Sequence, residues 1–466
     1  MALKCAQCGT ELPLYPPRGK CTKCGKALEY EISAPKDWKQ IFSGKLRFWR
    51  YRNLLPPVHN NATLGEGGTP LHRAERLAAK LGLKKLYLKD ETRNPTNSFR
   101  DRAAALLTSN AVDLKQGTLI CATNGNLGAS LAAYSAKAGL VCHTIVPKLV
   151  DVGKLAQMLV YDAVIEEFGE TVDDSISRAE ILAEQTGWYQ ATAELNPLVI
   201  EAQKTIAYEI QEQIGVPNWF MVSMGGGGTI YSIWKGFKEL KQLGVTKTLP
   251  KMIGVQPEGC ATIVEELEQG YSKPLEISKP LTRALAVLVR HPLQCELAKK
   301  AIEESEGLAL AVSDPEIFTA ELQIAKLEGI FAEPASSATI AALKKLTEKG
   351  KISQNDNTVC LITGSGLKAT NILQALTKKR KTAVIGLDAS TKQKILRILK
   401  RKDTYGYALW KKLGKTMTRA AVYQHLSELS EKGIIAGYAK GERRFFRLTQ
   451  RGKRVLRAID DLKSLL

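Results

Sequence analysis

Residues 220–240 read FMVSMGGGGTIYSIWKGFKEL, and this stretch decides the fold. Residues 220–223 form a short apolar run that is typical of a buried strand, and residues 230–240 follow a helical pattern. Between them, Gly225-Gly226-Gly227-Gly228-Thr229 would let backbone N–H groups close around an anion at the helix N-terminus. A glycine run alone can be a flexible loop, but its place between strand and helix predicts a phosphate site.

The same alternation of apolar strands and amphipathic helices extends over residues 65–375. Strands are expected at residues 86–89, 118–122, 220–223 and 359–363, and helices at residues 129–138 and 201–214. This alternation predicts an α/β fold with a mostly parallel sheet. Ligands of such sheets bind beyond the carboxyl ends of the strands. Two further loops, at residues 122–128 and 363–367, follow expected strands at that edge.

Several short motifs occur in a fixed order along this region. They are GEGGTPL (65–71), KDE (89–91), NPTNSFRDR (94–102), TNGNLG (123–128), NP (196–197), KT (204–205), EPAS (333–336) and TGSGLK (363–368). With them, the chain up to about residue 375 resembles threonine synthase, a pyridoxal-phosphate (PLP) enzyme family with a tryptophan synthase β-like fold, fold type II. The resemblance implies that Gly225 to Thr229 hold the PLP phosphate, that Asn126 bonds the pyridine 3-oxygen and that Thr363 contacts the ring nitrogen.

The chain departs from this family at the position that matters most for catalysis. The family motif has a lysine where this chain has Arg100, and that lysine forms a Schiff base and moves protons. A guanidinium stays protonated and is no nucleophile, so PLP, if bound, is expected to be held non-covalently. Lys89 is a weak alternative for the missing amine. Further departures, expected on the substrate side, are Leu127, Val199, Ser365 and Ala369.

Four of the nine cysteines lie in two C-x-x-C pairs near the N-terminus: Cys5, Cys8, Cys21 and Cys24. A glycine follows each pair and permits the tight turn that brings two thiolates to one tetrahedral metal. The pattern predicts a zinc ribbon with a structural zinc ion. Iron, vacant thiols or a redox pair are weaker alternatives.

Positive charge is concentrated at the C-terminal end of the chain. Residues 381–466 hold 21 basic and 7 acidic residues, a net charge of +14, whereas the whole chain has a net charge of +20. Such a concentration suits binding to a phosphate backbone, because neutralised phosphates release counterions. A lysine-rich solubilising tail is the alternative.

The basic segment has the pattern of a winged helix-turn-helix. Helices are expected from Ser390, over residues 405–413 and over residues 418–432, followed by strands at 434–438 and 443–448 and a last helix at 451–465. The segment resembles the PadR-like and ArsR-like regulators. In that arrangement the third helix enters the major groove and the wing follows the backbone of double-stranded DNA. The expected DNA-binding residues are Arg419, Tyr423, Gln424 and His425 on the helix and Lys440, Arg443 and Arg444 on the wing.

Other features bound the class of protein. No run of about 18 apolar residues and no secretory signal occurs, so a cytoplasmic protein without a membrane partner is expected. The expected domains are a zinc ribbon (1–30), a threonine synthase-like domain (31–375), a basic linker (376–389) and a winged helix (390–466). The last helix is expected to pair with its twin in a homodimer, although winged helices also mediate other protein contacts.

Together these features predict a transcription regulator with a catalytically inactive, threonine synthase-like sensor domain. Its effector would be an amino acid, a phosphorylated metabolite or PLP. The alternative is an active threonine synthase, or a related PLP-dependent amino-acid lyase, that also binds DNA. A weaker reading is a structural partner of an active paralogue.

Overall fold

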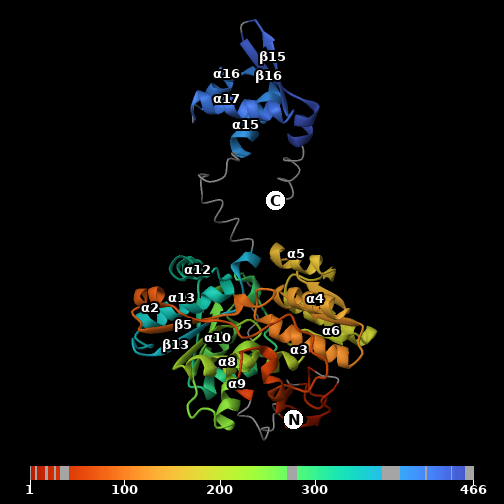
Figure 1. Cartoon of the computed structure of the whole chain (residues 1–466), viewed down its shortest axis with the longest axis vertical. Coiled ribbons are helices and arrows are strands. Elements are labelled where there is room, and N and C mark those ends of the chain that lie inside the picture. Colours follow the sequence, from red (N-terminus) through yellow and green to blue (C-terminus); the bar gives the residue numbers. More distant parts are fainter. Residues whose placement is uncertain are drawn as a thin grey trace. The chain divides into compact units, whose positions relative to one another are not determined.

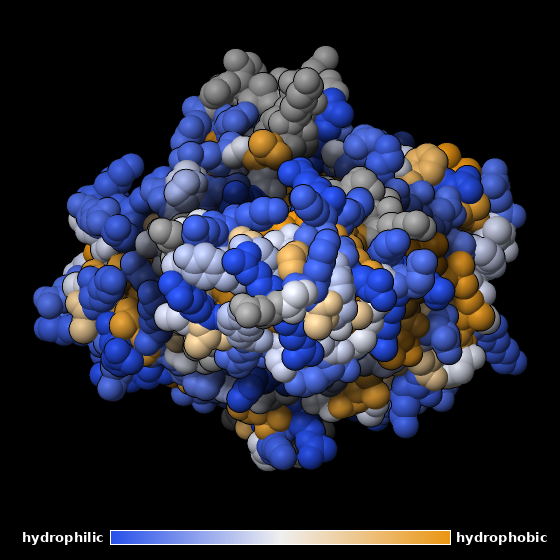
Figure 2. Space-filling view, turned by 90° about the horizontal axis from the view of Figure 1, so that it is seen from above, coloured by the Kyte–Doolittle hydropathy of each residue, from blue (hydrophilic) through white to orange (hydrophobic). Residues whose placement is uncertain are grey.

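The computed structural model describes residues 2–5, 8–15, 19–25, 28–31, 41–269, 281–369, 389–414, 417–441 and 443–456. The chain divides into two compact units, Met1–Gln374 and Ala375–Leu466. Among the described residues no helix is long and apolar enough to span a membrane. Hydrophilic residues predominate on the face shown in Figure 2, where apolar residues form separate groups.

Two sheets form the centre of the first unit (Figure 1). The larger has the strand order β12-β11-β10-β13-β5-β4, and only β4 runs antiparallel to its neighbour. The smaller has the order β8-β7-β6-β9, and all its strands are parallel. The strands are β4 Leu71–Arg73, β5 Lys85–Asp90, β6 Thr118–Ala122, β7 Val141–Val146, β8 Val164–Glu167, β9 Tyr189–Gln190, β10 Trp219–Ser223, β11 Lys251–Pro257, β12 Leu308–Val312 and β13 Asn357–Ile362.

The expected single sheet is therefore two sheets. The chain leaves the larger sheet after β5, builds the smaller one from β6 to β9 and returns with β10. Each local pattern predicts a buried parallel strand, but strand patterns do not state which strands pair. The carboxyl ends of β6, β10 and β13 lead into the three loops singled out by the sequence.

Helices cover both sheets. They are α2 Glu75–Lys80, α3 Arg100–Asp113, α4 Asn126–Ala138, α5 Val152–Val160, α6 Val172–Thr186, α7 Leu198–Gln203, α8 Thr205–Ile214, α9 Gly228–Gln242, α10 Thr262–Gln269, α11 Cys295–Glu304, α12 Asp314–Glu328 and α13 Pro334–Glu348. The helix expected at residues 201–214 is split in two at Lys204. There the Thr205 hydroxyl donates a hydrogen bond to the Ala202 carbonyl oxygen, which competes with the regular backbone pattern.

The N-terminal segment adds a small antiparallel sheet of order β2-β1-β3. Its strands are β1 Ala2–Cys5, β2 Glu11–Leu12 and β3 Leu28–Glu31. Leu3, Leu28 and Tyr30 of this sheet are buried in the same hydrophobic core as the helices around the smaller sheet. The cysteine-rich segment is thus packed onto the rest of the first unit.

The described part of the second unit contains the helices α15, α16 and α17, a further helical segment and a three-stranded sheet of order β14-β16-β15. Its elements are α15 Ala389–Arg401, β14 Thr404–Tyr405, α16 Gly406–Lys412, α17 Arg419–Glu431, β15 Ile435–Lys440 and β16 Arg443–Leu448. The described part of α15 already includes Ala389, so Ser390 lies in its first turn and not before it. The two-residue strand β14 was not expected, because so short a strand leaves no periodic pattern.

The core of this unit confirms the expected helix faces. Its buried residues include Ile395, Leu396 and Leu399 of α15 and Val422, Leu426 and Leu429 of α17. Residues 450–456 are helical and begin the last expected helix. The rest of that helix, Glu442 between the two wing strands and residues 376–388 of the expected linker lie outside the described residues.

Candidate functional site

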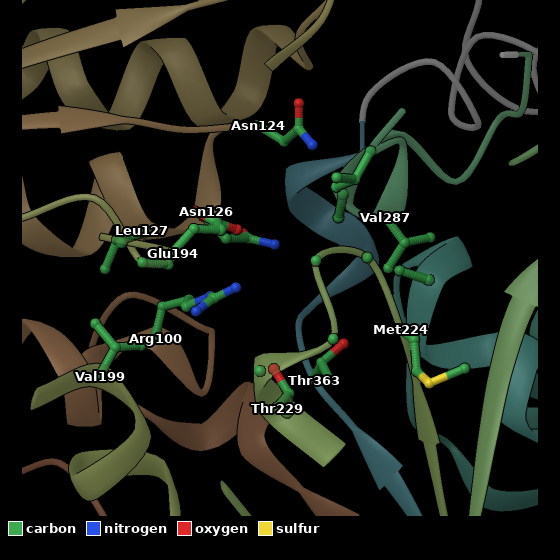
Figure 3. Close-up of a pocket in the computed structure, with 18 of the residues that line it drawn as sticks. Arg100, Asn124, Asn126, Leu127, Glu194, Val199, Met224, Thr229, Val287 and Thr363 are labelled. Carbon is green, nitrogen blue, oxygen red and sulfur yellow. The ribbon is translucent and has the colours of Figure 1, made fainter. Parts of the chain in front are cut away.

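A pocket lies where the loops after β6, β10 and β13 meet. It brings together the residues expected to hold a cofactor, namely Asn126, Gly225, Gly226, Gly227, Gly228, Thr229 and Thr363. Asn126 and Thr363 are more than 230 residues apart in the chain, and the two sheets place them around one space with the glycine loop. Figure 3 shows Arg100, Asn126 and Glu194 along one side of this pocket, with Thr229 and Thr363 at another.

The glycine loop joins β10 to the N-terminus of α9. Gly227 precedes the helix with a φ of 98°, a conformation that glycine adopts without strain. A side chain would also collide here, because a Cβ atom on Gly227 would lie 2.7 Å from the carbonyl oxygen of Gln294. The loop therefore combines backbone N–H groups that no side chain covers with the positive end of a helix dipole, and this combination suits a phosphate group.

Glu333 also lines the pocket and contacts two of the expected cofactor-binding residues. The Asn126 amide donates to its Oε1 and Oε2 atoms at 3.2 and 3.0 Å, and the Thr363 hydroxyl donates to Oε1 at 3.2 Å. Lys154 Nζ lies 3.5 Å from Glu333 Oε2. The buried Oδ1 atom of Asn126 has no hydrogen-bond partner among the described residues, so a ligand donor can satisfy it.

Arg100 is the first residue of α3, and its half-buried side chain lines the pocket. Its guanidinium carbon lies 4.7 Å from the centroid of the Phe99 ring. Burial lowers the pKa of Arg100, and the nearby Glu194 carboxylate opposes this shift. Arginine nevertheless stays charged in proteins, so the pocket holds a permanent cation at this position.

Lysines near the pocket are committed to other contacts. Lys89 is fully buried and its Nζ atom donates to Thr69 O, Glu209 Oε2 and Gln213 Oε1. Lys368 is buried, its Nζ atom donates to Thr96 O, and burial lowers its pKa to about 8. Neither side chain lines the pocket, and within the described ranges no lysine does.

The family departures fall in two places. Leu127 and Val199 line the pocket beside Arg100, as expected. Ser365 and Ala369 are buried but do not line it, so the expectation that all the departures gather on the substrate side is wrong for these two. Ser365 instead accepts a hydrogen bond from the Leu367 N–H in the turn after β13.

Glu194 is a pocket residue that the sequence analysis missed. It lies near Arg100 and Asn126, and a Cβ atom on Gly226 would be 3.0 Å from its Oε1 atom (Figure 3). Burial raises the pKa of Glu194, while Arg100 lowers it. A single acidic residue in the apolar segment 191–200 was the available signal, but acidic residues are common and only the fold places this one in the pocket.

The four N-terminal cysteines come together. Their Sγ atoms lie 3.4 Å apart for Cys5 and Cys24, 3.7 Å for Cys8 and Cys21 and 3.5 Å for Cys8 and Cys24. These separations are close to those of thiolates around one tetrahedral ion with metal–sulfur distances of about 2.3 Å. Gly9 and Gly25 both have positive φ, and each donates its N–H to the carbonyl oxygen of the first cysteine of its pair.

The expected DNA-binding residues lie mainly on the surface of the second unit. Arg419, Tyr423 and Gln424 of α17 are exposed, whereas His425 is half-buried. Thr418 caps α17 by accepting the Ala421 N–H. Arg419 is held between two rings, with its guanidinium carbon 4.9 Å from the centroids of both Tyr407 and Trp410.

The wing carries its arginines on aromatic rings. Lys440, Arg443 and Arg444 are exposed on β15 and β16. The Arg443 guanidinium lies 4.8 Å from the Tyr405 ring centroid, and that of Arg444 lies 5.8 Å from Phe446. Arg447, which the sequence analysis did not select, is also exposed and lies 5.6 Å from the Tyr438 ring.

Known proteins resemble both units. A family model described as pyridoxal-phosphate dependent enzyme matches residues 62–364, and one described as transcriptional regulator PadR-like family matches residues 395–458. Threonine synthase of Methanosarcina acetivorans is 39% identical over 372 residues, which cover 78% of this chain and 92% of that protein. Threonine synthase of Methanocaldococcus jannaschii is 40% identical over 380 residues, which cover 79% and 93%.

Solved structures share the fold at lower identity. Maize serine racemase has a TM-score of 0.57 and 19% identity, and the match covers 66% of this chain and 92% of that one. The processed form of threonine deaminase isoform 2 from Solanum lycopersicum has a TM-score of 0.55 and 24% identity, with 67% and 88% covered. These matches bear on the fold alone.

Proposed function

Because the chain belongs to the pyridoxal-phosphate-dependent enzyme family and carries a PadR-like domain, we propose that it is a transcription regulator whose enzyme-like domain senses a ligand without catalysis. One observation carries this proposal. By the resemblance of residues 94–102, Arg100 would take the place of the family's reactive lysine, and no lysine lines the pocket in the part of the chain that the structure describes. A pocket that keeps its binding groups but lacks the amine can bind without reacting.

The pocket fits PLP as a non-covalent ligand. When bound, PLP supplies an aldehyde that can condense with amino groups and an electron-withdrawing ring attached to it. The glycine loop would bind its phosphate, Asn126 its 3-oxygen and Thr363 its ring nitrogen. The glycine loop, where a Cβ atom on Gly227 would collide, supports this fit. Covalent attachment does not fit, since Arg100 cannot provide the amine.

The N-terminal cysteines would hold a structural zinc ion. Their four Sγ atoms lie within 4.8 Å of one another, and two of the thiols, Cys5 and Cys21, are buried. With four thiolate ligands a tetrahedral zinc ion has no open position, so it would stabilise the segment and would not catalyse.

The second unit would bind double-stranded DNA as part of a homodimer. Helix α17 would enter the major groove and the wing would contact phosphates through Lys440, Arg443 and Arg444. The aromatic rings beneath Arg419 and Arg443 would hold their guanidinium groups in place before DNA arrives. Ligand binding would regulate this contact only if the two DNA-binding states bind the ligand with different affinity.

The alternative function is that of an active threonine synthase that also binds DNA. Its support is the identity of 39–40% to proteins named threonine synthase over more than nine tenths of their length. This function requires a base other than the family's lysine, and Lys89 and Lys368 are both engaged outside the pocket.

Borohydride reduction after incubation with PLP separates the two functions. The wild-type chain is expected to show no covalent PLP adduct in the pocket by peptide mass spectrometry, whereas Arg100→Lys is expected to gain one at residue 100. Production of threonine from phosphohomoserine by the wild-type protein would overturn the proposal.

Recovery of genomic DNA fragments by the full chain, with and without candidate metabolites, tests whether the protein binds DNA and whether a ligand regulates that binding.

A further inference from the structure

Arg100 and Glu194 put two opposite charges in one pocket. Both side chains line it and point into it in Figure 3, yet they form no ion pair within 4.0 Å, and neither pairs with another described residue at that distance. Their charges still influence each other, because Arg100 lowers the pKa of Glu194 against the effect of burial. A half-buried cation and anion that both lack an ion-pair partner among the described residues are costly to keep unless a ligand completes them.

The two charges suit two groups of one molecule, a carboxylate for Arg100 and an ammonium group for Glu194. The planar guanidinium of Arg100 can bind a carboxylate through two parallel hydrogen bonds. Arg100 is also the first residue of the 14-residue helix α3, where the helix dipole favours an anion. The Glu194 carboxylate, in contrast, suits an ammonium group, which would stabilise its charged form.

The walls next to this pair are apolar. Leu127 and Val199 are both 3% exposed and line the pocket, together with Ala193. None of these side chains can satisfy a polar or charged ligand group, so burying such a group there would be unfavourable. Glu194 adjoins the glycine loop, since its Oε1 atom would lie 3.0 Å from a Cβ atom on Gly226, so a ligand group bound by Glu194 would lie beside that loop.

We propose that Arg100 and Glu194 recognise the zwitterion of a free α-amino acid with a small apolar side chain, which binds non-covalently beside the glycine loop. Arg100 binds the carboxylate, Glu194 binds the ammonium group, and Leu127 and Val199 surround the side chain. This inference rests on the proposed function, because a reacting pocket would transform an amino acid instead of holding it.

Isothermal titration of the full chain with L-valine tests the pair, in the absence and presence of PLP. L-Valinol lacks the carboxylate, 3-methylbutanoate lacks the ammonium group and L-aspartate has a charged side chain. We expect each of these probes to bind at least about tenfold more weakly than L-valine, because each leaves one buried group unpaired. Arg100→Met and Glu194→Gln should each weaken L-valine binding by a similar factor, and Arg73→Met, which removes an exposed guanidinium, should not.

The outcomes distinguish this inference from the proposed function. Three results would each overturn the inference. They are equal affinities for L-valine and L-valinol, an unchanged L-valine affinity of Arg100→Met, and no L-valine binding at about 10 mM, a concentration at which even weak metabolite sites fill. If the chain still binds DNA and still forms no covalent PLP adduct, the proposed function stands in each of these cases. Thermal melting of both variants shows whether they are folded. If Glu194→Gln still binds L-valine more tightly than 3-methylbutanoate, that result would also count against the pair.

Discussion

The Nζ atom of Lys89 lies 2.7 Å from Glu209 Oε2, and neither side chain is exposed to solvent. Arg102 joins the same group through Glu209 Oε1 at 2.6 Å and Glu91 Oε1 at 2.8 Å. Two buried cations thus balance two buried carboxylates in this cluster. Lys89 is therefore part of a buried ion-pair cluster that stabilises the fold, and it is not available as a catalytic amine.

Replacing Lys89 should therefore destabilise the protein. Lys89→Met leaves the Glu209 carboxylate with one buried cation fewer, and breaking such a pair costs about 3 kcal/mol in the free energy of unfolding. Chemical denaturation measures this loss, and Lys85→Met, at the exposed start of the same strand, is the matched control. A variant as stable as the wild type would contradict the structural role.

The glycine loop should not tolerate a side chain at Gly227. Gly227→Ala combines a φ of 98° with a Cβ atom 2.7 Å from a backbone oxygen, and should cost about 1–3 kcal/mol in stability as well as weaken PLP binding. Gly187→Ala has a φ of 71° with nothing within 4 Å and is the control for backbone strain alone. Absorbance titration with PLP compares the two, and equal PLP affinities would rule out a close contact at Gly227.

Metal analysis should find about one zinc ion per chain, as four thiolates form one tetrahedral site. Cys8→Ser should lose most of this zinc and melt at a lower temperature, because one ligand is removed. Cys142→Ser changes a buried cysteine in the smaller sheet and should retain the metal. Full zinc content in Cys8→Ser, measured by mass spectrometry, would be evidence against the site.

Binding to DNA should weaken steeply with salt. If Lys440 contacts a phosphate, Lys440→Ala should reduce the slope of log K against log salt by about 0.9. Lys241→Ala removes an exposed lysine of the first unit and should leave the slope unchanged. Fluorescence anisotropy at several salt concentrations gives both slopes, and identical values for the two variants would remove Lys440 from the interface.

Stability should also depend on pH through Glu321. This side chain is 2% exposed, neither of its oxygens has a hydrogen-bond partner among the described residues, and burial with the nearby charge of Glu333 raises its pKa to about 8. The folded protein keeps the proton up to about pH 8, whereas the unfolded chain loses it near its ordinary value of 4.5. Stability should therefore fall as pH rises between these values, by up to about 1.4 kcal/mol per pH unit.

Glu321→Gln tests this dependence, because glutamine cannot ionise. Denaturation curves between pH 5 and pH 9, roughly the range over which the group titrates, should show a flatter profile for the variant than for the wild type. Parallel profiles would mean that another group sets the pH dependence.

Much of the local structure of this protein could be predicted from its sequence alone. The run at residues 118–122, the glycine loop, the cysteine pairs and the core faces of α15 and α17 all depend on neighbours within a few residues, and local patterns predict such features. The motifs with Asn126 and Thr363 likewise identified residues that do meet in one pocket.

Only the tertiary structure decided which residues share a space. It divided the expected sheet into two, placed Ser365 and Ala369 outside the pocket and brought Glu194 into it. It also showed that Lys89 forms a buried ion pair with Glu209. Such relationships join residues that are tens to hundreds of positions apart, and the chain reaches them only through packing, which no local pattern of residues encodes.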